Sequence, residues 1–352
     1  MSQPLPAAGR LPARAASTAP WLLLAALAVT ALPAAAVTVT AFATHLPQSL
    51  YGLTSDSQAL YYTGATGALR DYNRGPDTGV LGKVMLATGA ASILYDRTNY
   101  ATSSSHVAPM QLVTDGAGNL SWADPDAGSG TGASFIRGTT GGAAPTQFFA
   151  ICCGPSVLPG DGIGWAASGG QTYFSDATGG RVGANPNGSS ATQIGPTRYA
   201  PDFATATFSQ IAVSKGKIFL ADSGQILGAD GNSVALQVDQ SAFVTPAVRW
   251  ISVDGSSGFV DLSVGKIDHP HGIVAVGKFL YVTGTDKIWK VNATTGKTQL
   301  FASSKHFQDL RGITYVNGVF YVADSQTIFG PPVDGVATAT ADGPGIIWKV
   351  VP

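Results

Sequence analysis

One strand pattern recurs six times along this chain of 352 residues and constrains its fold more than any other feature. The clearest copy reads GIVAV, a turn at Gly277-Lys278, FLYVTG, KIWKV, NATTG and TQLFAS. Alternating β-branched and aromatic residues bounded by glycine, asparagine and aspartate are typical of short antiparallel strands. The next copy, RGITYV-NG-VFYVAD, carries Asn317-Gly318, which predicts a two-residue hairpin because both residues tolerate positive φ. The repeated unit is therefore a group of four short strands.

Each copy is recognised by the end of its second strand. These ends fall at Gly64, Asp124, Asp176, Asp222, Gly284 and Asp324. Third strands are predicted at GKVML, ASFIRG, GRVGA, GQILGA, DKIWKV and GIIWKV, and fourth strands at ASILYD, TQFFAI, ATQIG, VRWISVD and TQLFAS. The sixth copy has no fourth strand of its own, because the chain ends at Pro352 just after the sixth third strand.

The segment VTVTAFAT, at residues 37–44, resembles a fourth strand and supplies the missing one. A ring of four-stranded sheets needs its first and last members joined, since open sheet edges invite aggregation. We therefore predict an all-β fold, a six-bladed β-propeller with four-stranded antiparallel blades, in which an N-terminal strand completes the last blade. The alternative is a β-sandwich with irregular hairpins, which explains neither the six copies nor the complementary ends.

Residues 1–36 have the features of a signal or targeting peptide. Arg10 and Arg14 are the only charges, an apolar run extends from Trp21 to Leu32, and small residues precede a predicted cleavage after Ala36. Residues 37–352 then form a single propeller domain. This pattern predicts a secreted or periplasmic protein, and the basic, acid-free segment is also compatible with a thylakoid lumen. An uncleaved signal anchor is the remaining alternative.

The charged residues narrow the possible partners. The formal net charge is -1 and the body of the chain has no basic run, so we expect no nucleic-acid partner. We also expect no membrane association after signal cleavage, and a monomer. All 21 acidic residues are aspartate, so no glutamate can act as an acid, a base or a metal ligand. Low charge and 44 glycines suit a large core with many turns.

PHGIVAVGKFLYVTGTDKIWKV and RGITYVNGVFYVAD resemble blades of the NHL and SMP-30/gluconolactonase-like propellers. The resemblance extends from about Asp261 to Pro352 and is faint over the first four copies. It implies a six-bladed fold, and the family includes lactonases that hold a metal in the central channel and an amidating lyase with metal-binding histidines. The lactonase pattern includes a glutamate ligand near the start of the first blade. This chain has none, which counts against lactonase activity.

Antiparallel order within a blade places the connector into each first strand and the connector after each second strand on the same face. All five histidines precede predicted first strands: His45, His106, His269, His271 and His306. The residues expected to border the central channel are Tyr51, Met110, Asp161, Ser209 or Gln210, His271 and Arg311. The histidine-bearing face is therefore the predicted binding face.

Three of these residues could carry chemistry. His271 could act as a base or metal ligand, Asp161 as a ligand and Arg311 as an electrophile that polarises a carbonyl or holds a carboxylate. A divalent metal in the channel would take His271 and Asp161, with His269 as a further ligand. The alternative is a satisfied hydrogen-bond network that plugs the channel. We expect His271 to end a loop and bury little surface, so that His271→Ala folds.

Other conspicuous residues have structural interpretations. An aspartate that ends a second strand can accept a hydrogen bond from the backbone N–H two residues on and so stabilise the following turn. The tryptophans at strand positions are interpreted as packing between blades: Trp122, Trp165, Trp289 and Trp348. Sequons at Asn119, Asn187 and Asn292 would be glycosylated only in a host with the machinery.

Cys152 and Cys153 are the only cysteines and are adjacent. In an exported protein two cysteines are expected to pair, and a disulfide between neighbours would stiffen a loop on the histidine-bearing face. Two reduced thiols or a soft-metal site are the alternatives. Together with Tyr51, Met110 and His269, the two cysteines are our predicted ligand-binding residues.

Three functions remain open. The first is an exported propeller that binds a small molecule, glycan or protein on the face of the strand-entry loops. The second is a metal-assisted hydrolase or lyase at the channel mouth, of the lactonase or lyase kind. The third is a structural wall or matrix protein. Convergence of His271, Asp161 and Arg311 around one cavity would separate them.

Overall fold

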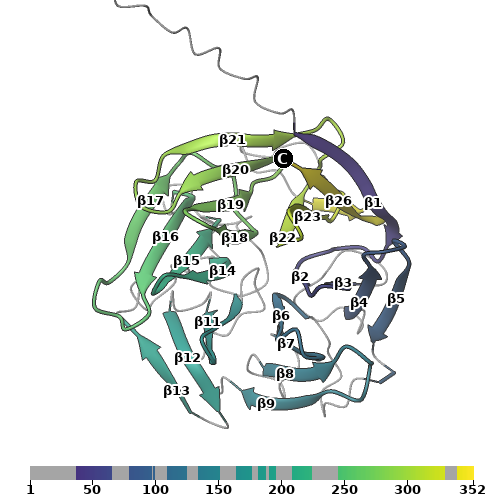
Figure 1. Ribbon diagram of the computed structural model, residues 1–352, viewed down its shortest axis with the longest axis horizontal. Coiled ribbons are helices and arrows are strands. Elements are labelled where there is room, and N and C mark those ends of the chain that lie inside the picture. The colour runs from purple at the N-terminus through teal and green to yellow at the C-terminus, as the bar shows by residue number, and fades with distance from the viewer. Residues whose placement is uncertain are drawn as a thin grey trace, which may run out of the picture. The chain divides into compact units, whose positions relative to one another are not determined.

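The computed structural model shows six four-stranded antiparallel sheets around a common centre (Figure 1). It describes residues 37–65, 79–96, 98–99, 109–124, 134–150, 164–176, 181–187, 190–195, 208–223, 245–329 and 339–352. The predicted six-bladed β-propeller is therefore confirmed. No helix in the described parts of the chain is long and apolar enough to span a membrane. The predicted targeting segment, residues 1–36, lies outside the described residues.

The first three blades follow one another along the chain, each with its strands in order from the centre outwards. Blade 1 consists of β2 Leu53–Ser55, β3 Ala59–Ala65, β4 Gly79–Met85 and β5 Ala91–Tyr95. Blade 2 consists of β6 Leu112–Thr114, β7 Asn119–Asp124, β8 Ser134–Thr139 and β9 Thr146–Ala150. Blade 3 consists of β10 Trp165–Ser168, β11 Gln171–Asp176, β12 Arg181–Asn187 and β13 Ser190–Ile194.

The last three blades include the closure of the ring. Blade 4 consists of β14 Phe208–Ser214, β15 Lys217–Asp222, β16 Ala247–Ser252 and β17 Val260–Val264. Blade 5 consists of β18 Ile273–Val276, β19 Phe279–Thr283, β20 Lys287–Asn292 and β21 Thr298–Ser303. Blade 6 consists of β22 Leu310–Val316, β23 Val319–Asp324, β26 Gly345–Val351 and β1 Thr38–Leu46, and a small hairpin of β24 Thr327–Phe329 and β25 Ala339–Asp342 precedes β26.

The predicted ring closure is confirmed by the pairing of β1 with β26. Thr38 lies opposite Val351, Thr40 opposite Lys349, and the antiparallel register shifts twice toward Leu46. The first described strand thus becomes the outer strand of the last blade. Figure 1 shows β1 in purple beside β26 in yellow.

The sequence interpretation of blade 4 was wrong in two strands. GQILGA, at residues 224–229, was predicted as the third strand, but it lies outside the described residues and the structure forms the third strand from β16. VRWISVD was predicted as the fourth strand, yet Val248 pairs with Ala221 of the second strand and the fourth strand is β17. Strand pairing, which depends on the neighbouring blade, decided between two apolar runs of similar appearance.

Tight turns join the first and second strands of most blades. Asn317 and Gly318 both have positive φ, at 53° and 83°, as a type I′ hairpin turn requires, which confirms the predicted turn. Lys215 and Gly216, at 50° and 72°, form a turn of the same kind. Glycine or asparagine at such positions lets two strands reverse without strain, so the first two strands of these blades stay in register.

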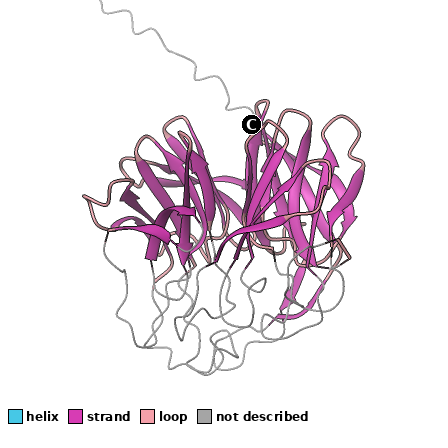
Figure 2. Ribbon diagram, turned by 90° about the horizontal axis from the view of Figure 1, so that it is seen from below, coloured by secondary structure: helices cyan, strands magenta, loops and turns pink. Residues whose placement is uncertain are grey.

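The two faces of the ring differ in their connections. We call the face where second strands end and first strands begin the connector face, marked by Gly64, Asp124, Asp222, Gly284 and Asp324. The opposite face, marked by the turns Lys215-Gly216, Gly277-Lys278 and Asn317-Gly318, is the turn face. Figure 2 shows the short turns along one rim of the strands. The connections on the connector face are the longer ones, for example residues 66–78 between β3 and β4.

Apolar side chains fill the seams between blades. One buried cluster joins blades 4 and 5 through Phe219, Val248, Ile273 and Leu280. The predicted packing role of the tryptophans is confirmed for Trp122, Trp165 and Trp348, which are buried, while Trp289 is partly buried. Each seam removes apolar surface of two sheets from water, which stabilises the ring as a whole.

Candidate functional site

The centre of the ring is built at one position of each first strand. In each blade, one residue comes just before the stretch where the first strand pairs continuously with the second. These six residues form an inner ring: Gly52, Gln111, Gly164, Gln210, Gly272 and Gly312. Four of the six are glycine, and at these four the neighbouring atoms leave no room for a Cβ. A Cβ on Gly272 would overlap the carbonyl of Arg311, and one on Gly312 would lie 2.7 Å from the carbonyl oxygen of Tyr51.

In every second blade, a hydroxyl group of the second strand contacts the inner ring. Thr63 of blade 1 accepts a hydrogen bond from the N–H of Gly52 and donates to the carbonyl of Met110 in blade 2. Thr283 of blade 5 does the same with Gly272 and the carbonyl of Arg311 in blade 6. In blade 3 the N–H of Gly164 donates to the Ser175 hydroxyl. In blades 1, 3 and 5 a hydroxyl therefore accepts a hydrogen bond from the N–H of the inner-ring glycine. Blades 2, 4 and 6 have alanine in place of the hydroxyl residue.

Two glutamines cross the centre. The Oε1 of Gln111 accepts from the N–H groups of Trp165 and Ile211, and its Nε2 donates to the carbonyl of Ile211. Gln210 of blade 4 donates from Nε2 to the carbonyl of Tyr51 in blade 1, at 2.9 Å. Both glutamine side chains are buried. A hydrogen-bonded network therefore crosses the centre at this level.

His271 and Arg311 meet at the mouth of the centre on the connector face. The Nη1 of Arg311 donates to Nδ1 of His271 at 3.1 Å. The Nε and Nη2 of the same guanidinium both donate to Oδ2 of Asp309, at 2.9 and 2.8 Å. The Ser325 hydroxyl donates to that oxygen as well, at 2.6 Å. The guanidinium is thus braced on both sides and its side chain is 16% exposed.

The expectation that His271 buries little surface was wrong, because the residue is only 4% exposed. Its backbone N–H donates to the carbonyl of Thr283, which places it at the start of the blade rather than in a loose loop. Burial lowers the pKa of His271 well below its usual value, and the charges of Arg311 and His269 lower it further. The ring is therefore neutral near pH 7. Since Nδ1 accepts from Arg311, the proton of this neutral ring lies on Nε2.

Asp324 holds the backbone of the segment that carries Asp309 and Arg311. Its Oδ1 accepts from the N–H groups of Asp309 and Gln326, and its Oδ2 accepts from the N–H of Gln308 and the indole N–H of Trp348. The bond from Gln326 confirms the predicted turn role of a second-strand aspartate. Burial raises the pKa of Asp324, although the four hydrogen bonds favour its ionised form.

The other described histidines have different surroundings, although the charge of His269 acts on His271. His269 is 44% exposed, has a positive φ of 41°, and places Nε2 3.5 Å from Oδ1 of Asp268. His45 belongs to β1 and not to a connector, so its predicted place was wrong. His306 stacks on Trp348 with ring centroids 6.2 Å apart. His106 lies outside the described residues.

Several predicted site residues cannot be placed on this mouth. Asp161, Cys152 and Cys153 lie outside the described residues, so their roles stay predictions. Tyr51 and Met110 are buried, and their carbonyl groups take part in the central network. His271 lies two residues before β18 begins. The same offset from the start of β10 is position 163, so Asp161 lies two residues before the position in blade 3 that corresponds to His271.

The described residues around His271 bear on the predicted metal in the channel. Within the described ranges, no three His, Cys, Asp or Glu residues are grouped closely enough to hold a metal ion. The predicted pair of His271 and Asp161 depends on a residue outside those ranges. On the described side, Nδ1 of His271 faces the Arg311 cation, which a divalent metal would have to approach. The arrangement of His271 does not favour a metal ligand.

Asp309 and Ser325 were missed by sequence reasoning. Asp309 precedes Arg311 by two residues, the spacing that puts side chains on the same side of an extended segment. The same spacing relates His269 to His271, so the signal was present in QDLRG and HPHG. Ser325 follows Asp324 and gave no signal, because its contact with Asp309 crosses between two segments.

Comparisons with solved structures place this geometry among known propellers. The chain is similar to a gluconolactonase from Xanthomonas campestris, with a TM-score of 0.56 and 10% identity over 90% of this chain and 89% of that one. Streptogramin B lyase has a TM-score of 0.51 and 12% identity over 89% and 97% of the two chains. The luciferin-regenerating enzyme has a TM-score of 0.55 and 13% identity over 90% and 96%.

Neither a protein-family model nor a curated protein matches the chain. At these identities the structural likeness shows the fold alone, because propellers host many unrelated functions. The resemblance to NHL and SMP-30 blades is therefore confirmed only at the level of architecture. The chain is a six-bladed β-propeller of the fold that a gluconolactonase and a streptogramin lyase also have.

Proposed function

We propose that the protein is a binding module whose ligand docks on the connector face at the mouth formed by His271 and Arg311. The observation that carries the proposal is the braced guanidinium of Arg311, which is held by Asp309 and His271 yet remains partly exposed. A cation fixed in this way is pre-organised for an oxygen-bearing ligand, because little side-chain entropy is lost on binding.

The hydrogen-bonded network across the centre also favours binding at the mouth over chemistry inside a channel. Gln111, Gln210 and the two threonines use their polar groups on one another and on the backbone. The longer connections are on this same face, and in propellers as in other folds such loops supply specificity. Small molecules, glycans and proteins with carboxylate or hydroxyl groups all fit this chemistry.

The test is a titration of the purified protein with a panel of neutral glycans, uronic acids and small carboxylates. Arg311→Lys keeps the charge but removes the planar fork, so we expect it to weaken the bound member of the panel by about tenfold or more. Lys297→Gln, an exposed change on the turn face, serves as the control. Equal affinity of the Arg311→Lys variant and the parent would place the ligand elsewhere.

A metal-assisted hydrolase or lyase is the second candidate. It is favoured by the neutral state of His271 near pH 7, since a general base must be unprotonated. Elemental analysis of the protein purified without chelator, beside His271→Ala, separates the two candidates. We expect no stoichiometric metal. Near-stoichiometric metal that is lost in the variant, with hydrolysis of esters or lactones, would replace the binding proposal.

We also propose that the protein is exported and begins after Ala36, from the pattern of residues 1–36. N-terminal sequencing of the protein recovered outside the cytosol would then start at Val37. The same sample tests the proposed disulfide between Cys152 and Cys153, because alkylation without reductant should modify neither cysteine. A start at Met1, or two alkylated cysteines, would contradict these proposals.

A further inference from the structure

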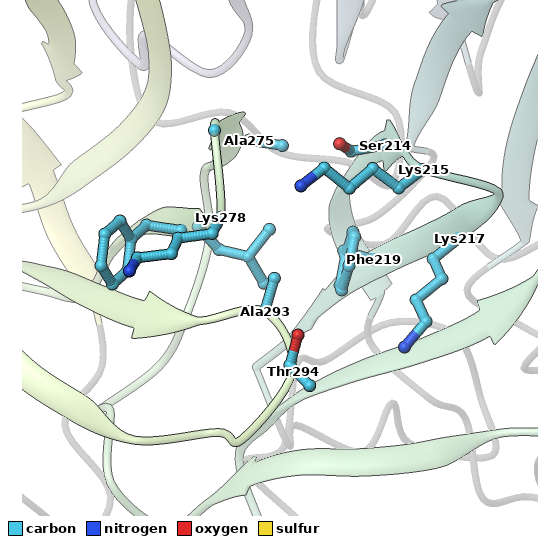
Figure 3. Close-up of a pocket in the computed structure, with 11 residues that line it drawn as sticks. Ser214, Lys215, Lys217, Phe219, Ala275, Lys278, Ala293 and Thr294 are labelled. Atoms are coloured by element: carbon cyan, nitrogen blue, oxygen red, sulfur yellow. The ribbon is translucent and has the colours of Figure 1, made fainter.

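A hollow on the turn face lies between blades 4 and 5, away from the mouth described above. Figure 3 shows it between the turn that joins β14 to β15 and the turn that joins β18 to β19. The hollow has a volume of about 80 Å³. We call it the blade 4–5 pocket, and its defining residues are Lys215, Lys217, Phe219, Lys278, Leu280 and Thr294.

The floor of the pocket is apolar. Phe219 and Leu280 are buried members of the cluster that joins the two blades. Ser214 and Thr294 add hydroxyl groups at the wall. A ligand that enters therefore meets an apolar surface below and hydrogen-bonding groups at the side, as is usual for small-molecule sites.

The rim of the pocket is basic. Lys215 and Lys278 are exposed and come from two neighbouring turns, and Figure 3 shows Lys215 extending from its turn toward Ala275. Lys217 is held with Nζ 3.5 Å from the ring centroid of Trp250. A cation over an indole ring is restrained in position without losing its charge. Three lysine side chains thus line one opening.

These lysines have no carboxylate partner among the described residues. The ion pairs within the described ranges involve Arg249, His269, Lys287 and Arg311 instead. An acidic residue, Asp254, lies one position after Val253, whose backbone N–H donates to the carbonyl of Gly216 in the β14–β15 turn. Its carboxylate accepts hydrogen bonds from the N–H and hydroxyl of Ser256. The positive charge at the rim is therefore not neutralised by an ion pair.

The charge is also local to this part of the turn face. The corresponding turns of blades 1 and 2 carry Asp56 and Asp115, and those of blades 3 and 6 are Gly169-Gly170 and Asn317-Gly318. A long polyanion that crossed the face would meet opposing carboxylates on two blades. A short anion that remains over blades 4 and 5 would not.

We propose that the blade 4–5 pocket binds a small organic anion, namely a carboxylate or a phosphate ester carried by an apolar group. The apolar group lies against Ala275 and Phe279, which are partly exposed beside the buried Phe219 and Leu280, and the anionic head lies among Lys215, Lys217 and Lys278. The head group accounts for attraction and the apolar body for retention, because lysine ammonium groups act as point charges without a fixed geometry. This site is independent of the mouth at Arg311.

The experiment titrates the purified protein with phenyl phosphate, benzoate and benzamide, monitored by calorimetry. Phenyl phosphate and benzoate distinguish the two head groups, and benzamide keeps the ring but lacks the charge. We expect at least one of the two anions to bind and benzamide not to bind at up to about 10 mM. Similar affinity for benzamide and benzoate would overturn the proposal, as would no binding of either anion.

Variants locate the site. Lys215→Asn keeps a residue that tolerates positive φ, and Lys278→Gln keeps the length of the side chain. Each should weaken the anion by about fivefold, and Lys278→Arg should restore it. Lys297→Gln, an exposed lysine outside the pocket, is the matched control, and unchanged thermal unfolding verifies the fold. An unchanged affinity in the Lys215→Asn, Lys278→Gln double variant would overturn the proposal, whereas Arg311→Lys should have no effect.

Discussion

Blades 4 and 6 bury an aspartate at the same position and stabilise it in different ways. In blade 4, Asp222 accepts from Nε of Arg249 at 2.6 Å, and both side chains are almost fully buried. In blade 6, the place of that arginine is taken by Trp348, whose indole N–H donates to Asp324 at 2.9 Å. The register confirms the equivalence, since Arg249 and Trp348 pair with the same position of their second strands.

The difference shows that a buried carboxylate at this position can take either an arginine or an indole N–H as its donor from the third strand. Arg249 also donates to Asp261 and to the carbonyl of Thr245, so blade 4 contains a compact group of one cation and two anions. Asp324 has only N–H donors around it and retains its desolvation cost, which appears as a raised pKa. Blade 4 should therefore be the more sensitive to loss of a partner, and blade 6 to a change of pH.

The largest effect is expected for Arg249→Met. The change keeps most of the side-chain volume but leaves the charge of Asp222 buried without its cation, which should lower the free energy of unfolding by about 3–5 kcal/mol. Urea denaturation measures the loss. The double variant Asp222→Ala, Arg249→Met should recover part of it. A loss in Arg249→Met no greater than that of Trp348→Phe would show that charge is not the difference between the blades.

Asp324→Asn should follow, with a loss of about 2–4 kcal/mol. The amide of asparagine has one acceptor oxygen, so its NH₂ group would face N–H donors that now meet Oδ1 or Oδ2. Urea denaturation at pH 7 provides the measurement. A neutral result would mean that the four hydrogen bonds contribute nothing net over the cost of burying the charge.

The same variant should reveal the pH dependence of Asp324. Because its folded pKa is raised, the group contributes stability that is fully present below its unfolded pKa of 3.8 and is lost as the pH rises through the folded pKa. The deficit of Asp324→Asn should accordingly be larger at pH 4 than at pH 7. Paired unfolding curves of parent and variant at both values test this, and a deficit that shrinks on acidification would reverse the sign.

Trp348→Phe removes one hydrogen bond of Asp324 and keeps an aromatic ring in the seam. The other three donors remain, so we expect a loss of about 1–2 kcal/mol. Thermal unfolding with a matched Trp289→Phe variant separates the hydrogen bond from the change in ring size, because Trp289 lies beside Gly284 and has no aspartate at that position. Equal losses in the two variants would show that the hydrogen bond from Trp348 to Asp324 contributes no net stability.

The smallest effect is expected for Asp261→Asn. Asp261 is 43% exposed and lies at the outer end of the blade 4 group, where water screens its charge. A loss below about 1 kcal/mol is expected in urea denaturation. A loss approaching that of Arg249→Met would show that the group acts as one unit.

The architecture could be predicted because the strand pattern repeats, but the clarity of the pattern varies along the ring. In blades 5 and 6 the third strand carries a tryptophan opposite a valine: Trp289 faces Val282 and Trp348 faces Val322. In blades 1 and 3 the bulk is on the other strand, where Tyr62 faces Gly82 and Phe174 faces Gly183.

The seam is filled from either strand, so packing does not preserve the sequence of a single strand. A Cβ on Gly82 or Gly183 would overlap the ring on the partner strand, which shows that the two positions change together. This exchange is why the early copies looked faint. In blade 4 the position holds Arg249, and no apolar periodicity could identify AVRWIS as the third strand.

The candidate site was predictable only as a set of positions. Antiparallel order predicted that His271 and Arg311 lie on one face, and the structure adds a hydrogen bond between them that was not predicted. Burial of His271 and the brace from Asp309 were not predictable, because they depend on how close the first strands approach at the inner ring. That distance is set by glycines 272 and 312, whose meaning appears only in three dimensions.

The pairing of β1 with β26 also determines when this protein can finish folding during its biogenesis. The ribosome makes β1 first and β26 last, so the outermost strand of the ring waits for most of the described chain before its partner exists. During that interval the edge of β1 is unpaired, and an unpaired strand edge can capture a neighbouring nascent chain. Slow synthesis would lengthen this exposure, and a chaperone that covers a single strand would shorten it.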